Sequence, residues 1–240
     1  MAPAGIGSRV EGVHPVAAAL KAGRVTRLYV EAGRGDHGAS ADVVETARTA
    51  GVEIEIVDSI WGYAETDAPQ GLVADARPIP FVAIDDLFVE RAAILVLDHL
   101  EDPRNVGAIA RSAVAAGMTG LVVPERRSAP ISSVAFKASA GALELIPFAT
   151  VSSVAECVTR AKKAGVWTVG LAGEGEQSLF DLPLLTESVA IFIGGEGSGL
   201  GRLVTDRLDL VVSIPIQRIE SLNASVAASL ACFEVWRIRN

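Results

Sequence analysis

The first 75 residues carry hydrophobic positions with two different spacings. Residues 11–22 and 39–50 have the three-to-four residue spacing of helices, and a glycine follows each of them. Residues 26–31 and 52–57 alternate between apolar and polar side chains, which is typical of half-buried strands, and residues 71–75 form a further candidate strand. The pattern predicts a small α/β unit at the start of the chain.

The rest of the chain repeats strand-like and helix-like segments. Residues 93–98 (AILVLD) form a continuous apolar run, as expected for a central strand of a parallel sheet. Further strands are predicted at residues 120–123, 166–171, 189–193 and 210–214. Helices are predicted at residues 105–116, 153–164 and 221–239. Because the two element types alternate, the fold class is predicted to be α/β with a parallel sheet in this second part.

Pro78 and Pro80 separate the two patterns. Proline restricts its own backbone and that of the preceding residue, so this stretch is expected to be extended. We therefore expect a first domain at residues 1–77, a linker at residues 78–92 and a second domain at residues 93–240.

The chain of 240 residues has a net charge of −8, which argues against a nucleic acid partner because phosphate binding needs clustered cations. The charge is unevenly distributed, since basic side chains outnumber acidic ones in residues 101–140. The basic residues there are Arg104, Arg111, Arg126, Arg127 and Lys137. They leave room for a local basic face on an acidic protein, although each of them suits an ordinary solvated position as well.

Composition also limits the class of protein. No apolar run reaches the length of about 20 residues that a membrane-spanning helix needs, and the first residues contain no hydrophobic signal segment. We therefore expect a cytoplasmic protein with no membrane partner. Cys157 and Cys232 lie in apolar contexts, which indicates buried free thiols. His14, His37 and His99 lack the spacing of a metal site, so no metal is expected.

Three of the predicted strands are followed by residues that could carry chemistry, because open α/β sheets bind ligands beyond the carboxyl ends of their strands. The strand at residues 93–98 is followed, three residues later, by DPRNVG, in which Asn105 is either a helix cap or a site residue. The strand VAIFI is followed by GGEGSGL, in which Glu196 lies among glycines that form either a turn or a nucleotide-binding loop. The last is followed by IQRIESLNAS, where Ser221 or Asn223 could cap the final helix.

Taken together and in this order, the strings DPRNVGAIARSA, GGEGSGL and SIPIQRIESLNASVA resemble the SpoU/TrmH family of RNA 2′-O-ribose methyltransferases, in the SPOUT class. The string RVEGVHPVAAAL and the α/β unit after it resemble the N-terminal, L30e-like substrate-binding domain of bacterial members that modify 23S ribosomal RNA. The resemblance implies methyl transfer from S-adenosylmethionine to a ribose 2′-hydroxyl of RNA, with a guanosine of 23S rRNA as the expected target.

The resemblance also implies a fold, a site and an assembly. The second domain should contain a deep trefoil knot, an exception to the usual absence of knots, and the protein should be a homodimer. The implied catalytic residues are Asn105, Arg111, Glu196, Ser221 and Asn223. The cofactor, S-adenosylmethionine, is expected to contact Leu171, Ala172, Gly173, Gly194, Gly195, Ile214, Ile216 and Leu222.

One segment departs from the pattern of the family. Between Ile214 and Ser221 the chain is one residue shorter than usual and lacks the glycine that family members carry there. The departure falls at Gln217–Arg218, in a loop that is expected to adjoin the cofactor.

For the chemistry, we expect Arg111 to hold a phosphate beside the target ribose and to polarise the hydroxyl. It is unsuited to act as a general base, because arginine stays protonated in proteins. Glu196, Ser221 and Asn223 would then orient the ribose or the loop. Water or a phosphate oxygen could accept the proton, and the sequence does not decide between them.

The sequence leaves three other functions as alternatives. A tRNA ribose methyltransferase of the same class is less favoured, because minimal tRNA-modifying relatives often lack the first domain. A non-catalytic RNA-binding protein is disfavoured by the presence of Arg111, Glu196 and Asn223. A nucleotide-dependent oxidoreductase would need an early glycine-rich turn between a strand and a helix, followed by an acidic residue, and no such pattern occurs.

Overall fold

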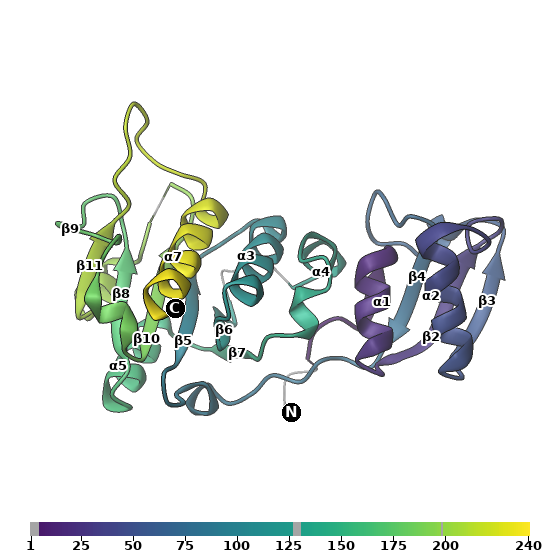
Figure 1. Cartoon of the computed structure of the whole chain (residues 1–240), viewed down its shortest axis with the longest axis horizontal. Coiled ribbons are helices and arrows are strands. Elements are labelled where there is room, and N and C mark those ends of the chain that lie inside the picture. The colour runs from purple at the N-terminus through teal and green to yellow at the C-terminus, as the bar shows by residue number, and fades with distance from the viewer. Residues whose placement is uncertain (1–4, 127–130, 198) are drawn as a thin grey trace. The chain divides into compact units, whose positions relative to one another are not determined.

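The computed structural model describes residues 5–126, 131–197 and 199–240. The chain forms two compact units, which are drawn with their elements labelled in Figure 1. Unit 1 contains Met1–Pro80 and Pro130–Leu145, and unit 2 contains Phe81–Ala129 and Ile146–Asn240. The predicted α/β class is confirmed. The division differs from the expected domains in two places. Residues 131–145 pack with unit 1 instead of the second domain, and residues 81–92 of the expected linker belong to unit 2.

Unit 1 is built on a sheet whose strands, among the described residues, lie in the order β1-β4-β2-β3. The strands are β1 (Arg9–Glu11), β2 (Val25–Glu31), β3 (Glu53–Val57) and β4 (Leu72–Ala76). Strands β2 and β3 are parallel, and β4 runs antiparallel to β1 and β2. The helices are α1 (Val13–Lys21) and α2 (Gly38–Thr49), with a 3₁₀ turn η1 at Ile60–Gly62.

The start of the first helix was predicted too early. Glu11 belongs to β1 and pairs with Val73, and its carboxylate is fully buried. The backbone N–H of Glu65 donates to Glu11 Oε1 at 2.5 Å, and the N–H of Thr66 donates to Oε2 at 3.1 Å. A buried carboxylate requires such donors, and they hold Glu11 in the sheet rather than in the helix.

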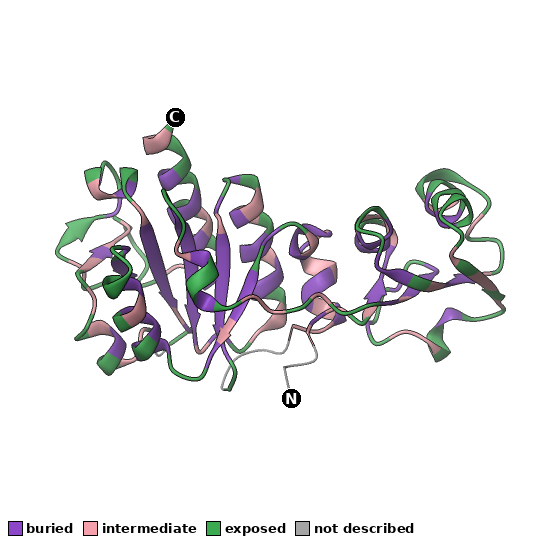
Figure 2. Cartoon of the chain, turned by 90° about the horizontal axis from the view of Figure 1, so that it is seen from below, coloured by how far each residue is buried: buried purple, intermediate pink, exposed green. Residues whose placement is uncertain are grey.

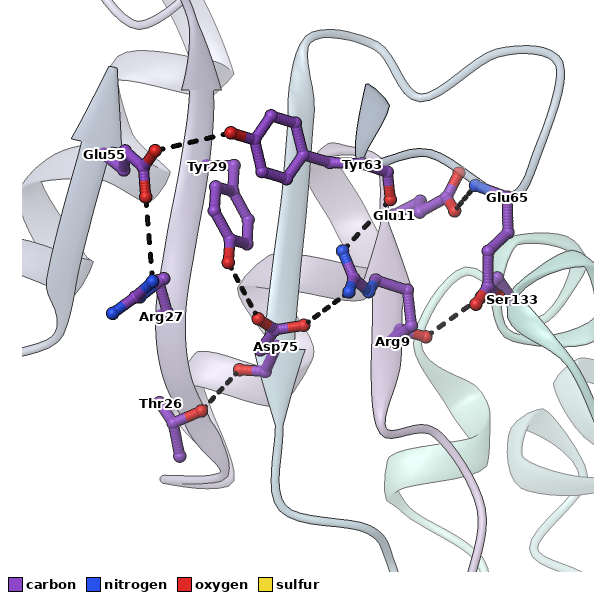
Figure 3. Close-up of polar contacts among 10 residues, drawn as sticks. All are labelled: Arg9, Glu11, Thr26, Arg27, Tyr29, Glu55, Tyr63, Glu65, Asp75 and Ser133. Carbon is purple, nitrogen blue, oxygen red and sulfur yellow. Dashed lines mark hydrogen bonds and ion pairs between the residues drawn. The ribbon is translucent and has the colours of Figure 1, made fainter. Parts of the chain in front are cut away.

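The face of this sheet that carries Tyr29 is covered by the loop that contains η1 (Figure 3). The rings of Tyr29 and Tyr63 stack with their centroids 4.2 Å apart. Tyr29 donates a hydrogen bond to Asp75 Oδ2 at 3.0 Å, and Arg9 forms an ion pair of 3.0 Å with Asp75 Oδ1. Arg9 also lies over the ring of Tyr29, 5.9 Å from its centroid. These contacts tie strands β1, β2 and β4 to the covering loop.

Residues 131–145 form α4 (Ser133–Ala138) and the 3₁₀ turn η3 (Ala142–Glu144), which contact β1 and α1. Ser133 donates to the carbonyl of Arg9 at 3.1 Å and to Glu65 Oε2 at 2.5 Å (Figure 3). Arg24 forms a bidentate pair with Glu144, in which Nε donates to Oε2 at 2.7 Å. The two side chains are only 11% and 2% exposed. This buried pair is one of the contacts that hold the segment on unit 1.

Replacing Glu144 with alanine is expected to lower the free energy of unfolding by about 3–5 kcal/mol, because it leaves the Arg24 guanidinium buried without its partner. Urea unfolding followed by circular dichroism measures the change. The control is Glu45→Ala, which breaks the Glu45–Arg48 pair, whose side chains are each 65% exposed. That control should change stability little. Equal effects of the two substitutions would show that residues 131–145 do not depend on the buried pair.

Unit 2 contains a parallel sheet with the strand order β7-β6-β5-β10-β8-β11-β9 among the described residues. The strands are β5 (Ala93–Asp98), β6 (Gly120–Pro124), β7 (Phe148–Val151), β8 (Trp167–Leu171), β9 (Gln177–Ser178), β10 (Val189–Gly194) and β11 (Leu210–Ser213). The central strands are buried (Figure 2), as the apolar runs predicted. Strands β7 and β9 were not predicted.

The helices of unit 2 are α3 (Pro103–Ala115), α5 (Val154–Lys163), α6 (Arg202–Thr205) and α7 (Ala224–Arg239). Two 3₁₀ turns, η2 (Ile84–Leu87) and η4 (Pro183–Thr186), complete the unit. Helix η2 lies in the expected linker, yet Ile84 and Leu87 are buried in the core of unit 2. Helices α3 and α7 pack against each other, and α7 also contacts β10.

Strand β10 lies between β5 and β8, although it follows both in the chain. Strands β6 and β7 lie on the β5 side of the central pair β5–β10, whereas β8, β11 and β9 lie on its β10 side. The carboxyl ends of β5 and β10 therefore mark the place where the strand order reverses, which is where α/β sheets commonly bind ligands.

Candidate active site

A pocket of about 710 Å³ opens at the carboxyl ends of β8, β10 and β11. Its lining includes all of the residues that the sequence analysis assigned to the cofactor: Leu171, Ala172, Gly173, Gly194, Gly195, Ile214, Ile216 and Leu222. It also includes Glu196, Ser221 and Asn223 from the predicted catalytic set. Residues separated by some 50 positions thus line one cavity, because parallel strands bring their carboxyl ends to the same edge.

The glycines after β10 are required by close backbone packing. A Cβ atom on Gly194 would lie 2.2 Å from the carbonyl carbon of Gly199, and one on Gly195 would lie 2.3 Å from the carbonyl oxygen of His99. The N–H of Gly199 donates to the carbonyl of Gly195 at 3.0 Å and closes the loop. The loop therefore presents Glu196 at its tip, where the side chain is exposed.

Glu196, Asn105 and Asn223 form a hydrogen-bonded triangle at the border of this pocket. Asn105 Nδ2 donates to Glu196 Oε1 at 2.7 Å, and Asn223 Nδ2 donates to the same oxygen at 2.8 Å. Asn223 Nδ2 also lies 3.2 Å from Asn105 Oδ1. Three of the predicted catalytic residues, from three separate segments, therefore meet directly.

The helix caps differ in part from the expectation. Asp102, not Asn105, is the N-cap of α3, and it accepts a hydrogen bond from the N–H of Arg104 at 2.8 Å. The amide of Asn105 is thus released from the helix and is buried against Glu196. Asn223 does cap α7, where its Oδ1 accepts from the N–H of Ser225 at 2.9 Å. Its oxygen holds the helix while its nitrogen holds Glu196.

Arg111 and Ser221 are not part of the triangle. Ser221 lines the pocket and is exposed. Arg111 lies on α3, is exposed, and lines neither this pocket nor the second cavity beside it. Its neighbour Ser112 makes a 2.7 Å hydrogen bond to Ser229 on α7, so Arg111 is adjacent to the contact between the two helices. Within one chain, the structure leaves this arginine apart from the other predicted catalytic residues.

The five basic residues noted in the sequence do not form one face of a single unit. Arg104, Arg111 and Arg126 are exposed in unit 2, whereas Lys137 lies in unit 1 and donates to the carbonyl of Ala68. Arg127 lies outside the described residues.

A second cavity of about 710 Å³ adjoins the first and shares Glu196 and Gly199 with it. Its other lining residues are His99, Leu100, Glu101, Asp102, Asn105 and Gly201. Sequence reasoning considered His99 only as a metal ligand and overlooked Asp98 before it. The signal that could have found them is a charged pair at the carboxyl end of the most apolar strand, where ligands of such sheets bind.

The shortened loop between β11 and α7 uses a backbone conformation that usually belongs to glycine. Arg218 has φ of 68°, in the left-handed region. This is the place where family members are expected to carry a glycine. The loop therefore keeps a left-handed turn here without a glycine, at some cost in backbone strain.

Replacing Arg218 with glycine is expected to raise the free energy of unfolding by up to about 1 kcal/mol, because relief of the left-handed strain outweighs the added freedom of the unfolded chain. Thermal unfolding measures the change, and calorimetry with S-adenosylmethionine tests whether the pocket is preserved. The matched control is Gln217→Gly, since Gln217 does not have a positive φ. The control should lose stability, and a similar loss for Arg218→Gly would contradict the interpretation.

Cys157 and Cys232 are free and buried, as predicted, and burial raises the pKa of both thiols to about 12. Among the described residues there is no group of three or more His, Cys, Asp or Glu side chains that could hold a metal ion. In the same part of the chain no helix is long and apolar enough to cross a membrane.

An α/β unit with a pocket at the carboxyl ends of parallel strands defines a class of ligand-binding fold, and the comparisons identify the family. The sequence profile of the "SpoU rRNA Methylase family" matches residues 92–233. A second profile, "RNA 2'-O ribose methyltransferase substrate binding", matches residues 9–82.

Relatives match over nearly the whole chain. The 23S rRNA (guanosine-2'-O-)-methyltransferase RlmB of Xanthomonas campestris is 38% identical over 241 residues, which cover 96% of both chains. The putative TrmH family tRNA/rRNA methyltransferase YacO of Bacillus subtilis is 36% identical and covers 85% of this chain and 84% of its own. The SpoU methyltransferase AviRb from Streptomyces viridochromogenes, solved with the cofactor AdoMet, superposes with a TM-score of 0.80 at 27% identity and covers 96% and 90%.

The chain belongs to the SpoU rRNA methylase family. It is an S-adenosylmethionine-dependent RNA 2′-O-methyltransferase, as the resemblance of its motifs predicted.

Proposed function

We propose that the protein methylates the ribose 2′-hydroxyl of a guanosine in 23S rRNA. The observation that carries this proposal is the meeting of the pocket at β8, β10 and β11 with the Asn105–Glu196–Asn223 triangle, in a chain that matches RlmB of Xanthomonas campestris over 96% of its length. A cofactor pocket is thereby joined to a cluster of polar groups suited to hold a ribose.

The residues of the first pocket suit S-adenosylmethionine. Leu171, Ile214, Ile216 and Leu222 offer apolar walls for a purine, and the glycines after β10 let the backbone approach closely. When bound, the cofactor supplies a methyl group on a positively charged sulfur. The chain's part is to hold that group at a fixed place, since positioning can supply roughly 7–11 kcal/mol of a barrier.

The triangle is proposed to orient the target ribose. Glu196 accepts two amide hydrogen bonds through Oε1, which leaves its second oxygen available to a substrate hydroxyl. Ser221 lines the same pocket and offers a further donor. Arg111 would hold the phosphate next to the ribose, because a guanidinium binds phosphate in a bidentate manner.

We propose that the protein is a homodimer and that Arg111 reaches the site of the partner subunit. Two observations support this. Arg111 lines neither of the two cavities described above. Helix α7 also exposes an apolar stripe at helical spacing, formed by Val226, Leu230, Phe233 and Trp236, each 36–49% exposed. Exposed apolar patches of this kind mark interaction surfaces, and a two-fold interface would create two equivalent shared sites.

We also propose that the C-terminal part of unit 2 passes through a trefoil knot. The insertion of β10 between β5 and β8, with β11 returning to the far side of β8, supports it. The segment between β11 and α7, which rises as an extended loop in Figure 1, would be the part that passes through.

Unit 1 is proposed to recognise the RNA, as an L30e-like domain at residues 1–77 joined by residues 78–92 to the catalytic domain at residues 93–240. The substrate-binding profile at residues 9–82 supports this role. The segment 131–145 then belongs by sequence to the catalytic domain and by packing to unit 1.

Labelled S-adenosylmethionine tests the proposed activity directly. The protein is incubated with 23S rRNA, 16S rRNA and tRNA from cells that lack its gene, and the RNAs are digested to nucleosides for mass spectrometry. We expect 2′-O-methylguanosine from 23S rRNA alone. Label in tRNA would favour the alternative that the name of YacO includes, and label in the base instead of the ribose would contradict the proposed chemistry.

A further inference from the structure

The second cavity contains a histidine that is held by a buried carboxylate. Asp98, the last residue of β5, is fully buried, and its Oδ2 accepts a hydrogen bond from the N–H of Gly201 at 2.9 Å. Its other oxygen, Oδ1, lies 2.5 Å from Nδ1 of His99. The imidazole is 42% exposed and lines the cavity beside Asn105 and Glu196. The buried carboxylate thus holds one edge of the ring while the other edge remains accessible.

This contact fixes which ring nitrogen carries the proton. A carboxylate can only accept hydrogen bonds, so Nδ1 of His99 is the donor to Asp98. In the neutral ring, Nε2 then carries a lone pair. The same arrangement of carboxylate, imidazole and free nitrogen prepares a histidine to take a proton from a hydroxyl in serine hydrolases.

The backbone of His99 is also held in an uncommon conformation. Its φ is 58°, in the left-handed region, and its carbonyl oxygen packs against Gly195 in the glycine loop. Non-glycine residues in this region are strained, and such residues cluster at functional sites. His99 thus combines an uncommon backbone conformation with a place in the cavity lining.

Other groups at the site are less suited to accept the proton. Arg111 has no acceptor atom. Glu196 is held through Oε1 by the amides of Asn105 and Asn223, and its second oxygen is assigned to orienting the ribose. His14 and His37 lie in unit 1, which makes His99 the sole histidine of unit 2 by sequence.

We propose that His99 is the general base of methyl transfer, with Asp98 as the residue that positions it. As the 2′-oxygen forms its bond to the methyl carbon, the carbon–sulfur bond breaks and its electron pair stays on sulfur. The hydroxyl proton passes to Nε2 of His99. The positive charge of the sulfonium is thereby replaced by that of the imidazolium, and the imidazolium later returns the proton to water. The proposal rests on RNA 2′-O-methyl transfer and not on the identity of the RNA.

The charged groups around His99 favour this role. Asp98 faces it from β5, Glu101 and Asp102 from the start of α3, and Glu196 from the loop after β10. All four are carboxylates, which stabilise a positive imidazolium once the proton has arrived. A step that needs a proton acceptor should slow as the pH is lowered.

Single-turnover methylation of rRNA and tRNA by His99→Asn and His99→Ala tests the proposal. Both variants should bind S-adenosylmethionine normally and transfer the methyl group about 10²- to 10⁴-fold more slowly, the usual contribution of a general base. The loss of rate at low pH should disappear. Added imidazole should restore part of the rate of His99→Ala, which a structural role would not explain. Lys163→Gln, an exposed change on α5 of the same unit, should leave rate and pH profile unchanged.

A second measurement needs no activity. Nitrogen NMR of the free protein should find His99 with its proton on Nδ1, and Asp98→Asn should abolish this preference.

A wild-type rate for His99→Asn, or a loss that is equal at every pH and insensitive to imidazole, would overturn the proposal. If the wild type methylates only tRNA, the 23S assignment is wrong. The His99 variants are then compared on tRNA, and that comparison still tests whether His99 is the general base. Failure to methylate any RNA would overturn both.

Discussion

Replacing Asn223 with aspartate is expected to leave the protein folded and almost inactive. Asn223 has two separate roles: Oδ1 caps α7, and Nδ2 donates to Glu196 and Asn105. Aspartate is as good an N-cap as asparagine, but it has no N–H to donate and places a negative charge beside Glu196. We expect the rate of methyl transfer to fall by about 10²- to 10³-fold, the usual cost of one preorganised hydrogen-bond donor.

The matched variant is Asn223→Ala, which loses both roles. It should show the same loss of rate and, in addition, a loss of about 1 kcal/mol in the free energy of unfolding from the missing cap. Rates measured with saturating S-adenosylmethionine and RNA, together with urea unfolding, separate the two contributions. If Asn223→Asp transfers methyl groups as fast as the wild type, the triangle has no part in catalysis.

Arg111→Ala and Asn223→Ala are each expected to inactivate the homodimer, yet a mixture of the two should regain activity. If Arg111 serves the partner's site, a mixed dimer contains one site with both residues intact and one site that lacks both. Random exchange of subunits makes about half of the dimers mixed. One active site in half of the dimers corresponds to roughly a quarter of wild-type activity.

The control for this experiment shows that subunits have exchanged. Pull-down of differently tagged subunits measures this exchange. If Arg111 acts within its own chain, every site of the mixed dimer lacks one residue, and activity stays at the level of the parents. Exchange without recovery would therefore contradict the shared site and would leave the exposed position of Arg111 in one chain without a catalytic explanation.

The buried strands were the part of the fold that the hydrophobic pattern predicted best. Strand β5 has the predicted bounds, and β10 extends the predicted segment by Gly194. Both are central in the sheet, so nearly every side chain is buried and the apolar run is continuous. Strands β7 and β9 were missed because they are short and lie at the two edges of the sheet.

The place of residues 131–145 could not be predicted from local pattern. The buried pair of Arg24 and Glu144 joins residues 120 positions apart, and neither residue stands out in its own segment. The same holds for Asn105, whose position near the start of a helix indicated a cap. Its actual partner, Glu196, is 91 positions away.

The family resemblance supplied what pattern alone could not, because it assigned residues from several strand ends to one pocket. All of the cofactor residues assigned in this way lie there. It did not point to Asp98 and His99, since the quoted motif begins at Asp102. Only the structure brings His99 beside Asn105 and Glu196.

Mapping of 2′-O-methyl groups in ribosomal RNA from living cells tests the central claim most directly. The RNA is compared between cells that lack the gene, the same cells carrying the wild-type protein, and cells carrying Asn223→Asp. Reverse transcription at low nucleotide concentration reveals each modified ribose as a stop. We expect one stop, at a guanosine of 23S rRNA, that is present only with the wild-type protein. An identical pattern of stops in the ribosomal RNA of all three strains would contradict this claim.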